Sequence, residues 1–411
     1  MGSMITLAVG NLEIDWSKNW LGRDHSKLFL ASDEVSVPYY YADEIVEQKP
    51  AFSRRLSAIR RRLGLLGYSL PSIRESYDRD AKSYPGYYPP LTVGFDQFAN
   101  AIAAVDATRF KGNDEGEFID PVNYDPGEYV SQEVFQSAEF NKVLSLRDLS
   151  REAGTFFENL DPYITLRLLL ENPSNHDAPV IWRFADVLEG GWVEAADVRP
   201  GLEDSERYLV VTEGSSDAQI LSSAAQLVAP DIADFFYFID MSDNYPFTGA
   251  GNVLRFCQGL AKIRIQNRVL VVLDNDAAGC ETLGRLSELS LPTNMKVAKL
   301  PDLEDCRSFP TIGPSGRALS DINGQAVSAE MFLDLTKVSK PEPVVRWTSF
   351  NDRLNRYQGE LVGKVRHTKE FLKARRARDY DLRKLTHLWD SLYAACTGEV
   401  AQPEPPKGAV A

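Results

Sequence analysis

The sequence lacks the marks of several protein classes. Its four cysteines form no Cys-x-x-Cys pair and its four histidines stand apart, so neither a disulfide framework nor a zinc ribbon is indicated. No apolar run approaches the roughly 18 to 20 residues that a membrane helix needs, and no secretory signal segment is visible. We therefore expect a cytoplasmic protein with no membrane partner.

Nucleotide-binding motifs are missing as well. The segment 359–365, Gly-Glu-Leu-Val-Gly-Lys-Val, is one residue short of a P-loop, and Val365 stands where a P-loop has the Ser or Thr that binds magnesium. Gly249 and Gly251 follow no clear strand and lack the third glycine of a dinucleotide fingerprint. The sequence therefore predicts neither an ATPase nor a dinucleotide-dependent enzyme.

Positive charge is scarce overall but concentrated locally. The formal net charge is −14, opposite to that of a uniformly charged nucleic-acid binder. Residues 346–387 nevertheless hold twelve Lys or Arg against five Asp or Glu, most densely at Arg375, Arg376 and Arg378. A second basic stretch is 54–62. Such stretches could bind nucleic-acid phosphates or form ordinary solvated or subunit-contacting helix faces, and the sequence leaves both interpretations open.

The most informative residues are two acidic strings, each directly after a short apolar run. The runs and their acidic residues are 208–211 with Glu213 and Asp217, and 268–273 with Asp274 and Asp276. Continuous β-branched runs are typical of parallel strands that are covered on both faces. Carboxylates at the carboxyl ends of such strands face the crevice where open α/β sheets bind ligands.

Each string alone has a purely structural interpretation. Glu213 could cap a helix that starts near Ser215, and Asn275 with Asp276 could form a turn. Together, however, carboxylates at matching strand ends would repel one another unless a cation neutralised them. Oxygen ligands suit Mg²⁺ or Mn²⁺ better than zinc. The sequence therefore predicts a metal site at these strand ends.

The spacing of these residues resembles a known domain. A strand ending in Glu213-Gly, followed about sixty residues later by Asp274-x-Asp276-x-x-Gly279, is similar to the Toprim domain of topoisomerases, DnaG-type primases, RecR proteins and OLD-family nucleases. The resemblance implies a Rossmann-like parallel sheet. It also implies that Glu213 acts as a general acid/base or metal ligand and that the two aspartates hold Mg²⁺.

Further acidic positions resemble the OLD-like nuclease branch of that family. These are Asp217 and, downstream, Asp321 and Glu330. This resemblance implies a site for two cations, Mg²⁺ or Mn²⁺, bound by these residues together with the strand-end carboxylates. Lys299 or Arg317 could help to stabilise charge on a bound phosphate.

The front of the chain carries a second resemblance. The segments 5–19, 24–26, 38–41 and 188–193 are similar to the N-terminal domain that precedes HEPN or Toprim effector domains in bacterial defence proteins. The resemblance implies a toxic effector that is controlled by a regulatory protein partner or that assembles as a homo-oligomer. It assigns no activity to particular residues of this domain.

We expect an α/β protein with a Toprim domain between a mixed α+β domain and short helices. The predicted parts are an N-terminal domain at 4–200, a Toprim domain at 205–337, a helical segment at 346–396 and a disordered tail at 397–411. Within the Toprim domain, strands near 208, 235, 269 and 296 alternate with helices near 219, 252 and 282, which indicates right-handed parallel crossovers. The N-terminal domain has predicted strands at 5–14 and 27–31, a helix at 51–64 and an exposed loop at 112–129.

These expectations combine into a metal-dependent nuclease that acts on DNA or RNA. Nothing in the residues distinguishes ribose from deoxyribose substrates. Two alternatives remain open: an RNA-processing ribonuclease, similar in its core to the Toprim-type maturases of ribosomal RNA, and a non-catalytic scaffold whose acidic cleft binds a metal or a basic partner.

Overall fold

The computed structural model describes residues 3–41, 45–83, 94–109, 160–238, 249–338, 342–377 and 379–399. The described chain forms two units, one within residues 1–201 and the other within residues 202–402. The predicted loop at 112–129, the residue Arg378 and most of the predicted tail lie outside the described residues.

The first unit is built on a five-stranded antiparallel sheet in the order β2-β1-β5-β4-β3. Its strands are β1 (Met4–Val9), β2 (Leu12–Lys18), β3 (Glu34–Tyr41), β4 (Ile45–Arg55) and β5 (Pro179–Arg183). The predicted single strand at 5–14 is wrong, because Gly10 turns the chain with a positive φ of 60° and makes a hairpin. The strand predicted at 27–31 is also wrong, since 3₁₀ turns occupy this region.

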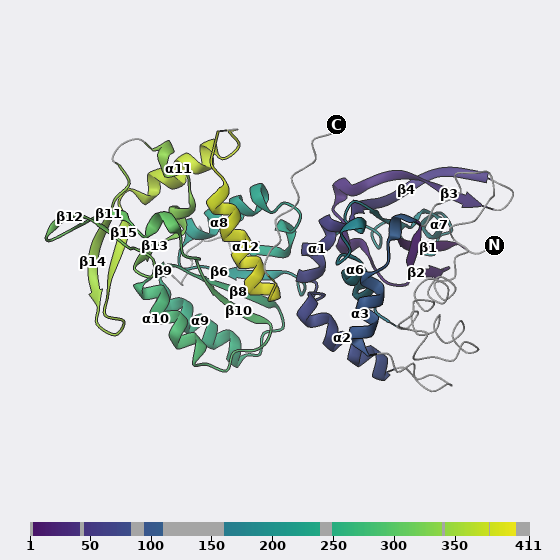
Figure 1. Cartoon of the computed structure of the whole chain (residues 1–411), viewed down its shortest axis with the longest axis horizontal. Coiled ribbons are helices and arrows are strands. Elements are labelled where there is room, and N and C mark those ends of the chain that lie inside the picture. The colour runs from purple at the N-terminus through teal and green to yellow at the C-terminus, as the bar shows by residue number, and fades with distance from the viewer. Residues whose placement is uncertain are drawn as a thin grey trace. The chain divides into compact units, whose positions relative to one another are not determined.

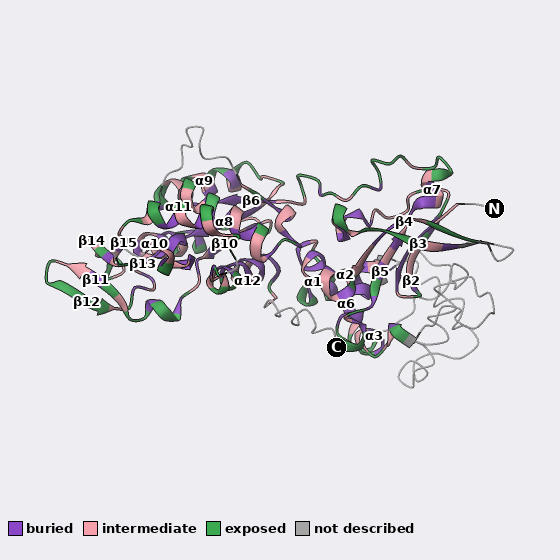
Figure 2. Ribbon diagram, turned by 90° about the horizontal axis from the view of Figure 1, so that it is seen from above, coloured by how far each residue is buried: buried purple, intermediate pink, exposed green. Residues whose placement is uncertain are grey.

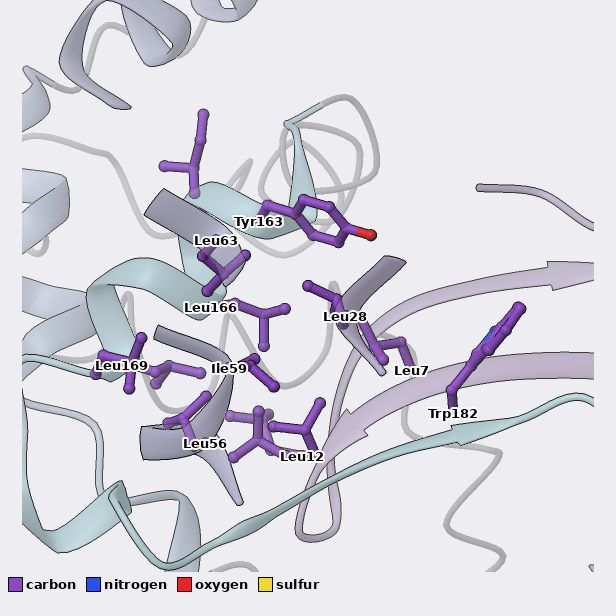
Figure 3. Close-up of a cluster of buried hydrophobic side chains, with 14 of the residues drawn as sticks. Leu7, Leu12, Leu28, Leu56, Ile59, Leu63, Tyr163, Leu166, Leu169 and Trp182 are labelled. Atoms are coloured by element: carbon purple, nitrogen blue, oxygen red, sulfur yellow. The ribbon is translucent and has the colours of Figure 1, made fainter. Parts of the chain in front are cut away.

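Helices supply the rest of the first core. They are α1 (Leu56–Leu65), α2 (Leu70–Ser83), α3 (Phe95–Ala103), α6 (Pro162–Leu169) and the short α7 (Ala185–Glu189). Side chains of α1 and α6 pack with those of the sheet strands in one hydrophobic cluster (Figure 3), to which the fully buried Trp182 of β5 also belongs. The helix predicted at 51–64 begins only at Leu56, because β4 continues through Arg55.

The second unit contains a parallel sheet in the order β10-β8-β6-β7 (Figure 1). Its strands are β6 (Tyr208–Val211), β7 (Phe236–Phe238), β8 (Arg268–Leu273) and β10 (Met295–Lys299), and its helices are α8 (Ser215–Val228), α9 (Ala250–Lys262) and α10 (Ala277–Ser287). Side chains of α9 and α10 share a hydrophobic core with β6 and β8. The predicted strands and helices and the α/β class are confirmed.

A second sheet, in the order β12-β11-β14-β15, follows in the same unit. Its strands are β11 (Phe309–Gly313), β12 (Gly316–Ser320), β14 (Val345–Asn351) and β15 (Arg356–Leu361). The prediction of a helical segment throughout 346–396 is therefore wrong at its start, where β14 and β15 form a hairpin. Two helices then follow, as predicted: α11 (Lys364–Ala374) and α12 (Arg383–Thr397).

Burial differs sharply between these two sheets. The parallel strands β6 and β8 are almost wholly buried, whereas most of β12 is exposed (Figure 2). Across the described ranges, none of the helices combines the length and the apolar character that crossing a membrane requires.

Candidate active site

Glu213 joins the ends of two parallel strands. It lies just beyond β6, and α8 begins two residues later at Ser215. Its Oε1 accepts a hydrogen bond of 2.9 Å from the backbone N–H of Asp274, which follows β8. Its own carbonyl oxygen accepts a hydrogen bond of 2.9 Å from the N–H of Gly249. The Glu213 side chain is therefore held at the carboxyl edge of the sheet, where the crevice was predicted.

The Asp-x-Asp-x-x-Gly string forms a tight turn into α10. Asp276 is the N-cap residue, and its Oδ1 accepts a hydrogen bond of 2.8 Å from the N–H of Gly279. A Cβ atom at position 279 would lie only 2.1 Å from the carbonyl oxygen of Asp274, so no residue other than glycine fits. Asn275 and Asp276 thus lie in a turn between strand and helix, in which Asp276 also caps the helix, and this turn brings both aspartates to the strand end.

The side chain of Asn275, which lies between the two aspartates, holds this turn in place through hydrogen bonds. The side chain is fully buried. Its Oδ1 accepts hydrogen bonds from Lys299 Nζ (2.6 Å) and from the N–H of Gly324 (2.8 Å), while its Nδ2 donates to Asp302 Oδ1 (2.7 Å). Lys299 also forms an ion pair of 3.1 Å with Asp302. The structure thus gives Lys299 the task of positioning the acidic turn.

Two further carboxylates complete an acidic cluster. Asp217 lies in the first turn of α8, and Glu330 lies in the 3₁₀ turn Ala329–Phe332, which packs against α8. Glu330 is buried and accepts a hydrogen bond of 2.7 Å from Ser328 Oγ. The members of this cluster come from four segments of the chain: Glu213, Asp217, Asp274, Asp276 and Glu330.

The pKa values record the crowding of negative charge. Burial, followed by the charge of Asp276, raises the pKa of Glu213 to about 7. Burial, followed by the charge of Glu330, likewise raises the pKa of Asp217 to about 7. Burial and the charges of Asp217 and Glu213 hold the pKa of Asp274 well above its ordinary range. The apoprotein therefore holds these carboxylates together against their mutual repulsion.

A lysine that the sequence analysis did not identify lies among these carboxylates. Lys364 is the first residue of α11, placed there by a left-handed Gly363 with φ of 83°. Burial alone would lower the pKa of Lys364, but the charges of Glu330 and Asp274, with others of the cluster, raise it. Among the described residues, the ammonium group of Lys364 forms no ion pair within 4.0 Å. Lys364 therefore interacts with the carboxylates through its charge, without direct contact.

His367, three residues after Lys364 on α11, is buried, and the charge of Glu330 acts on it. Burial lowers its pKa, against the opposing effect of the Glu330 charge. Its Nδ1 has no hydrogen-bond partner among the described residues. The start of α11 therefore supplies two basic side chains to an otherwise acidic site.

Comparison with known proteins bears on the other half of the chain. Residues 1–206 match the family model described as HEPN/Toprim N-terminal domain 1. The chain belongs to this family. No curated protein and no solved structure matches it. Membership in the HEPN/Toprim N-terminal domain 1 family confirms the resemblance seen in the N-terminal segments.

The carboxylate oxygens of the cluster are suitable ligands for a hard cation, but the side chains do not converge on a common metal position. Within the described part of this HEPN/Toprim family member, no three Asp, Glu, His or Cys side chains are arranged to hold a metal ion. Two of the carboxylates are already engaged, Glu213 with the Asp274 N–H and Asp276 with its helix cap. A cation would therefore have to draw these side chains inward.

Gln358 of β15 is a second residue that sequence reasoning missed. Its Nε2 donates a hydrogen bond of 2.5 Å to Asp276 Oδ2, and its Oε1 accepts one of 3.0 Å from the N–H of Ala278. Gln358 therefore orients Asp276 from the second sheet. A lone glutamine in an exposed strand carries no sequence signal that could have revealed this contact.

Other predicted site residues lie apart from the cluster. Asp321 is exposed, and its Oδ1 accepts hydrogen bonds from the N–H and the Nδ2 of Asn323. Arg317 is exposed on β12. The described contacts therefore bring neither Asp321 nor Arg317 to the carboxylates.

The predicted arginine cluster is also divided. Arg375 caps the end of α11, with Nη1 donating a hydrogen bond of 2.9 Å to the carbonyl oxygen of Leu372. Arg376 is exposed, and Arg378 lies outside the described residues. Only Arg376 of the three thus presents its side chain freely to solvent in the described structure.

Proposed function

We propose that this protein is a divalent-metal-dependent nuclease with a Toprim-type catalytic core. The observation that supports the proposal best is the cluster of five carboxylates near the carboxyl edge of the parallel sheet, for which Lys364 is the compensating cation among the described residues. A protein accepts the repulsion within such a cluster when a cation of its substrate complex relieves it. Membership in a family named for Toprim domains agrees with this function.

The proposed site takes two Mg²⁺ or Mn²⁺ ions. The charges divide into two pairs, because Asp276 has the largest charge effect on the pKa of Glu213 and Glu330 has the largest one on the pKa of Asp217. Asp274 acts with members of both pairs. Each pair together with Asp274 would supply the oxygen ligands that one hard cation prefers.

The ions would activate a water molecule and stabilise the leaving oxygen of the scissile phosphodiester. Glu213 holds the Asp274 backbone in place, and its carboxylate would act either as a ligand of the cation or as the general base that activates the water. Lys364 brings a positive charge to the phosphate oxygens, where negative charge develops in the transition state.

Incubation of the purified protein with DNA, tRNA and total RNA tests the proposal, with and without Mg²⁺ or Mn²⁺. A small phosphodiester, bis(p-nitrophenyl) phosphate, should be included because it reports on the carboxylate site alone. We expect cleavage that requires a divalent cation and disappears in Asp276→Asn. Absence of hydrolysis of every substrate would favour the non-catalytic scaffold, and cleavage confined to one RNA would favour the RNA-processing enzyme.

The proposed biological role is that of a toxic effector in bacterial antiphage defence. It rests on the family of the N-terminal domain. Expression of the parent protein should slow bacterial growth or restrict phage, and expression of Asp276→Asn should do neither. Equal toxicity of both proteins would contradict a role for nuclease activity.

A further inference from the structure

Three exposed cationic side chains lie along one face of α11, and a fourth follows in the turn after the helix. The helix buries His367, Thr368 and Phe371 against the rest of the second unit. Its opposite face carries cations at intervals of three and four residues, the spacing that aligns side chains on one face of a helix. These exposed residues form the basic stripe: Arg366, Lys369, Lys373 and Arg376.

The four cations of the basic stripe have no acidic partner among the described residues. In the described part of the chain, none of its four side chains makes a hydrogen bond or an ion pair. Four cations thus stay unpaired in a protein whose net charge is −14.

Neighbouring cations behave differently. Each of three nearby basic residues forms an ion pair with an aspartate. These pairs are Lys337 with Asp379 at 2.6 Å, Arg383 with Asp381 at 2.6 Å, and Lys384 with Asp305 at 2.9 Å. These neighbouring cations thus have acidic partners, which the described structure does not provide for the basic stripe.

The stripe begins close to the carboxylate cluster. Lys364, the residue that compensates the cluster, precedes Arg366 by two positions on the same helix. At 1.5 Å per residue, the seven steps from Arg366 to Lys373 span about 10 Å of α11, and Arg376 follows in the next turn. The helical part alone corresponds to roughly three phosphates along one strand of duplex DNA, at about 3.4 Å of helix axis each.

We propose that the basic stripe binds the sugar–phosphate backbone of the substrate strand on one side of the scissile phosphate. The proposal builds on the nuclease function and adds that the natural substrate is a polynucleotide several residues long. The contacts are to phosphates, so binding is independent of sequence and weakens as salt concentration rises.

A matched pair of triple variants tests the stripe. The stripe variant is Arg366→Gln/Lys369→Gln/Lys373→Gln, and the control variant is Lys337→Gln/Arg383→Gln/Lys384→Gln, which removes the same charge from paired residues. Glutamine retains the helix propensity of lysine and arginine. Binding of 30-residue single-stranded and duplex DNA and RNA oligonucleotides is measured across a salt series, in an Asp276→Asn background that prevents cleavage.

We expect the stripe variant to bind oligonucleotides at least tenfold more weakly, with a slope of log K against log salt that is smaller by about 2 to 3. In the catalytically intact background it should cleave oligonucleotides poorly yet hydrolyse bis(p-nitrophenyl) phosphate as fast as the parent. The control variant should match the parent in both assays. The four oligonucleotides show whether the stripe serves DNA or RNA, and single or paired strands.

Three results would overturn the proposal: unchanged oligonucleotide binding by the stripe variant, an equal loss in the control variant, or unchanged binding accompanied by a loss of self-association. The last would show that the stripe contacts an acidic protein surface. Failure of the proposed function is distinguishable from these, because it would leave the parent inactive on bis(p-nitrophenyl) phosphate while the binding series still reports on the stripe.

Discussion

The two units of the molecule bury charge in opposite ways. In the first unit, Arg23 Nη1 lies 2.8 Å from Asp161 Oδ1, and the guanidinium group lies 4.1 Å from the ring centre of Tyr163. His25 Nε2 likewise lies 2.8 Å from Asp15 Oδ2. Every charge of this network meets a complementary group, which is the arrangement expected of a structural element.

The second unit gathers like charges instead. Its five carboxylates are compensated at a distance by one lysine, and the pKa of Asp274 stands well above its ordinary range because of burial and neighbouring charge. Such an arrangement destabilises the folded apoprotein. The contrast supports the proposal of a functional site in the second unit, because a cost in stability is expected to be retained where ligand binding relieves it. The first unit shows that this chain can satisfy charge with partners elsewhere.

The largest expected effect is on catalysis. Asp276→Asn keeps the helix cap, because asparagine also caps, but removes an anionic ligand. Divalent-dependent cleavage should fall by at least about 100-fold, since a bound cation supplies several kcal/mol of transition-state stabilisation. Glu330→Gln should also lower the rate.

Asp321→Asn is the matched control for this prediction, because the described contacts of Asp321 are with Asn323. It should leave cleavage within about twofold of the parent. A loss in Asp321→Asn as large as that in Asp276→Asn would restore Asp321 to the metal site that the sequence predicted.

Substitutions of Lys364 and of Asp274 should shift the melting temperature in opposite directions. In metal-free buffer, Lys364→Met removes the cation from the cluster and should lower the melting temperature by roughly 4 to 8 °C, which corresponds to about 2 kcal/mol for a unit of this size. Asp274→Asn removes one repelling charge and should raise it. Differential scanning fluorimetry with and without Mg²⁺ measures both, and shifts of the same sign would refute the like-charge description of the site.

The first unit should show the ordinary response to loss of a charged partner. Arg23→Met leaves Asp161 without its ion pair and should lower the free energy of unfolding by about 2 kcal/mol, less than for a fully buried pair because Arg23 is partly exposed. Asp161→Asn should destabilise similarly. Neither effect should depend on Mg²⁺, and a cation-dependent shift in either variant would place a metal in this unit as well.

Sequence reasoning succeeded where chemistry and periodicity act locally. The strands β6 and β8 were predictable because each is a short, mostly apolar run, and the turn into α10 was predictable because Asn275 and Asp276 are residues that favour turns. The hairpin of β14 and β15 was missed because its strands are mostly exposed, and the residues from 346 to 396 were interpreted as having helical periodicity throughout.

The candidate site divides in the same way. Glu213, Asp274 and Asp276 follow strands directly, so their meeting could be deduced from a parallel sheet. Lys364 and Gln358 come close to the cluster because the chain, after the parallel sheet, forms the sheet of β11, β12, β14 and β15 and then returns to the carboxylates. Long-range returns of this kind leave no signal in the spacing of residues. Conversely, Asp321 has the expected spacing but faces its own loop.

The smallest expected effect is a pH dependence of stability that reverses the usual one. Glu213 and Asp217 have pKa values of about 7 in the folded protein, against ordinary values of 4.5 and 3.8. A carboxyl group whose pKa is raised on folding stabilises the protein fully below its unfolded pKa, and this contribution is lost as pH rises through the folded value. The melting temperature of the metal-free protein should therefore fall between pH 5 and pH 8. Glu213→Gln should flatten this slope, and saturating Mg²⁺ should do the same, because both remove the penalty for the charged carboxylate. Asp321→Asn, measured in parallel, should retain the slope of the parent. A metal-free protein that gains stability over this range would show that the carboxylate cluster is ionised and adequately compensated without a cation.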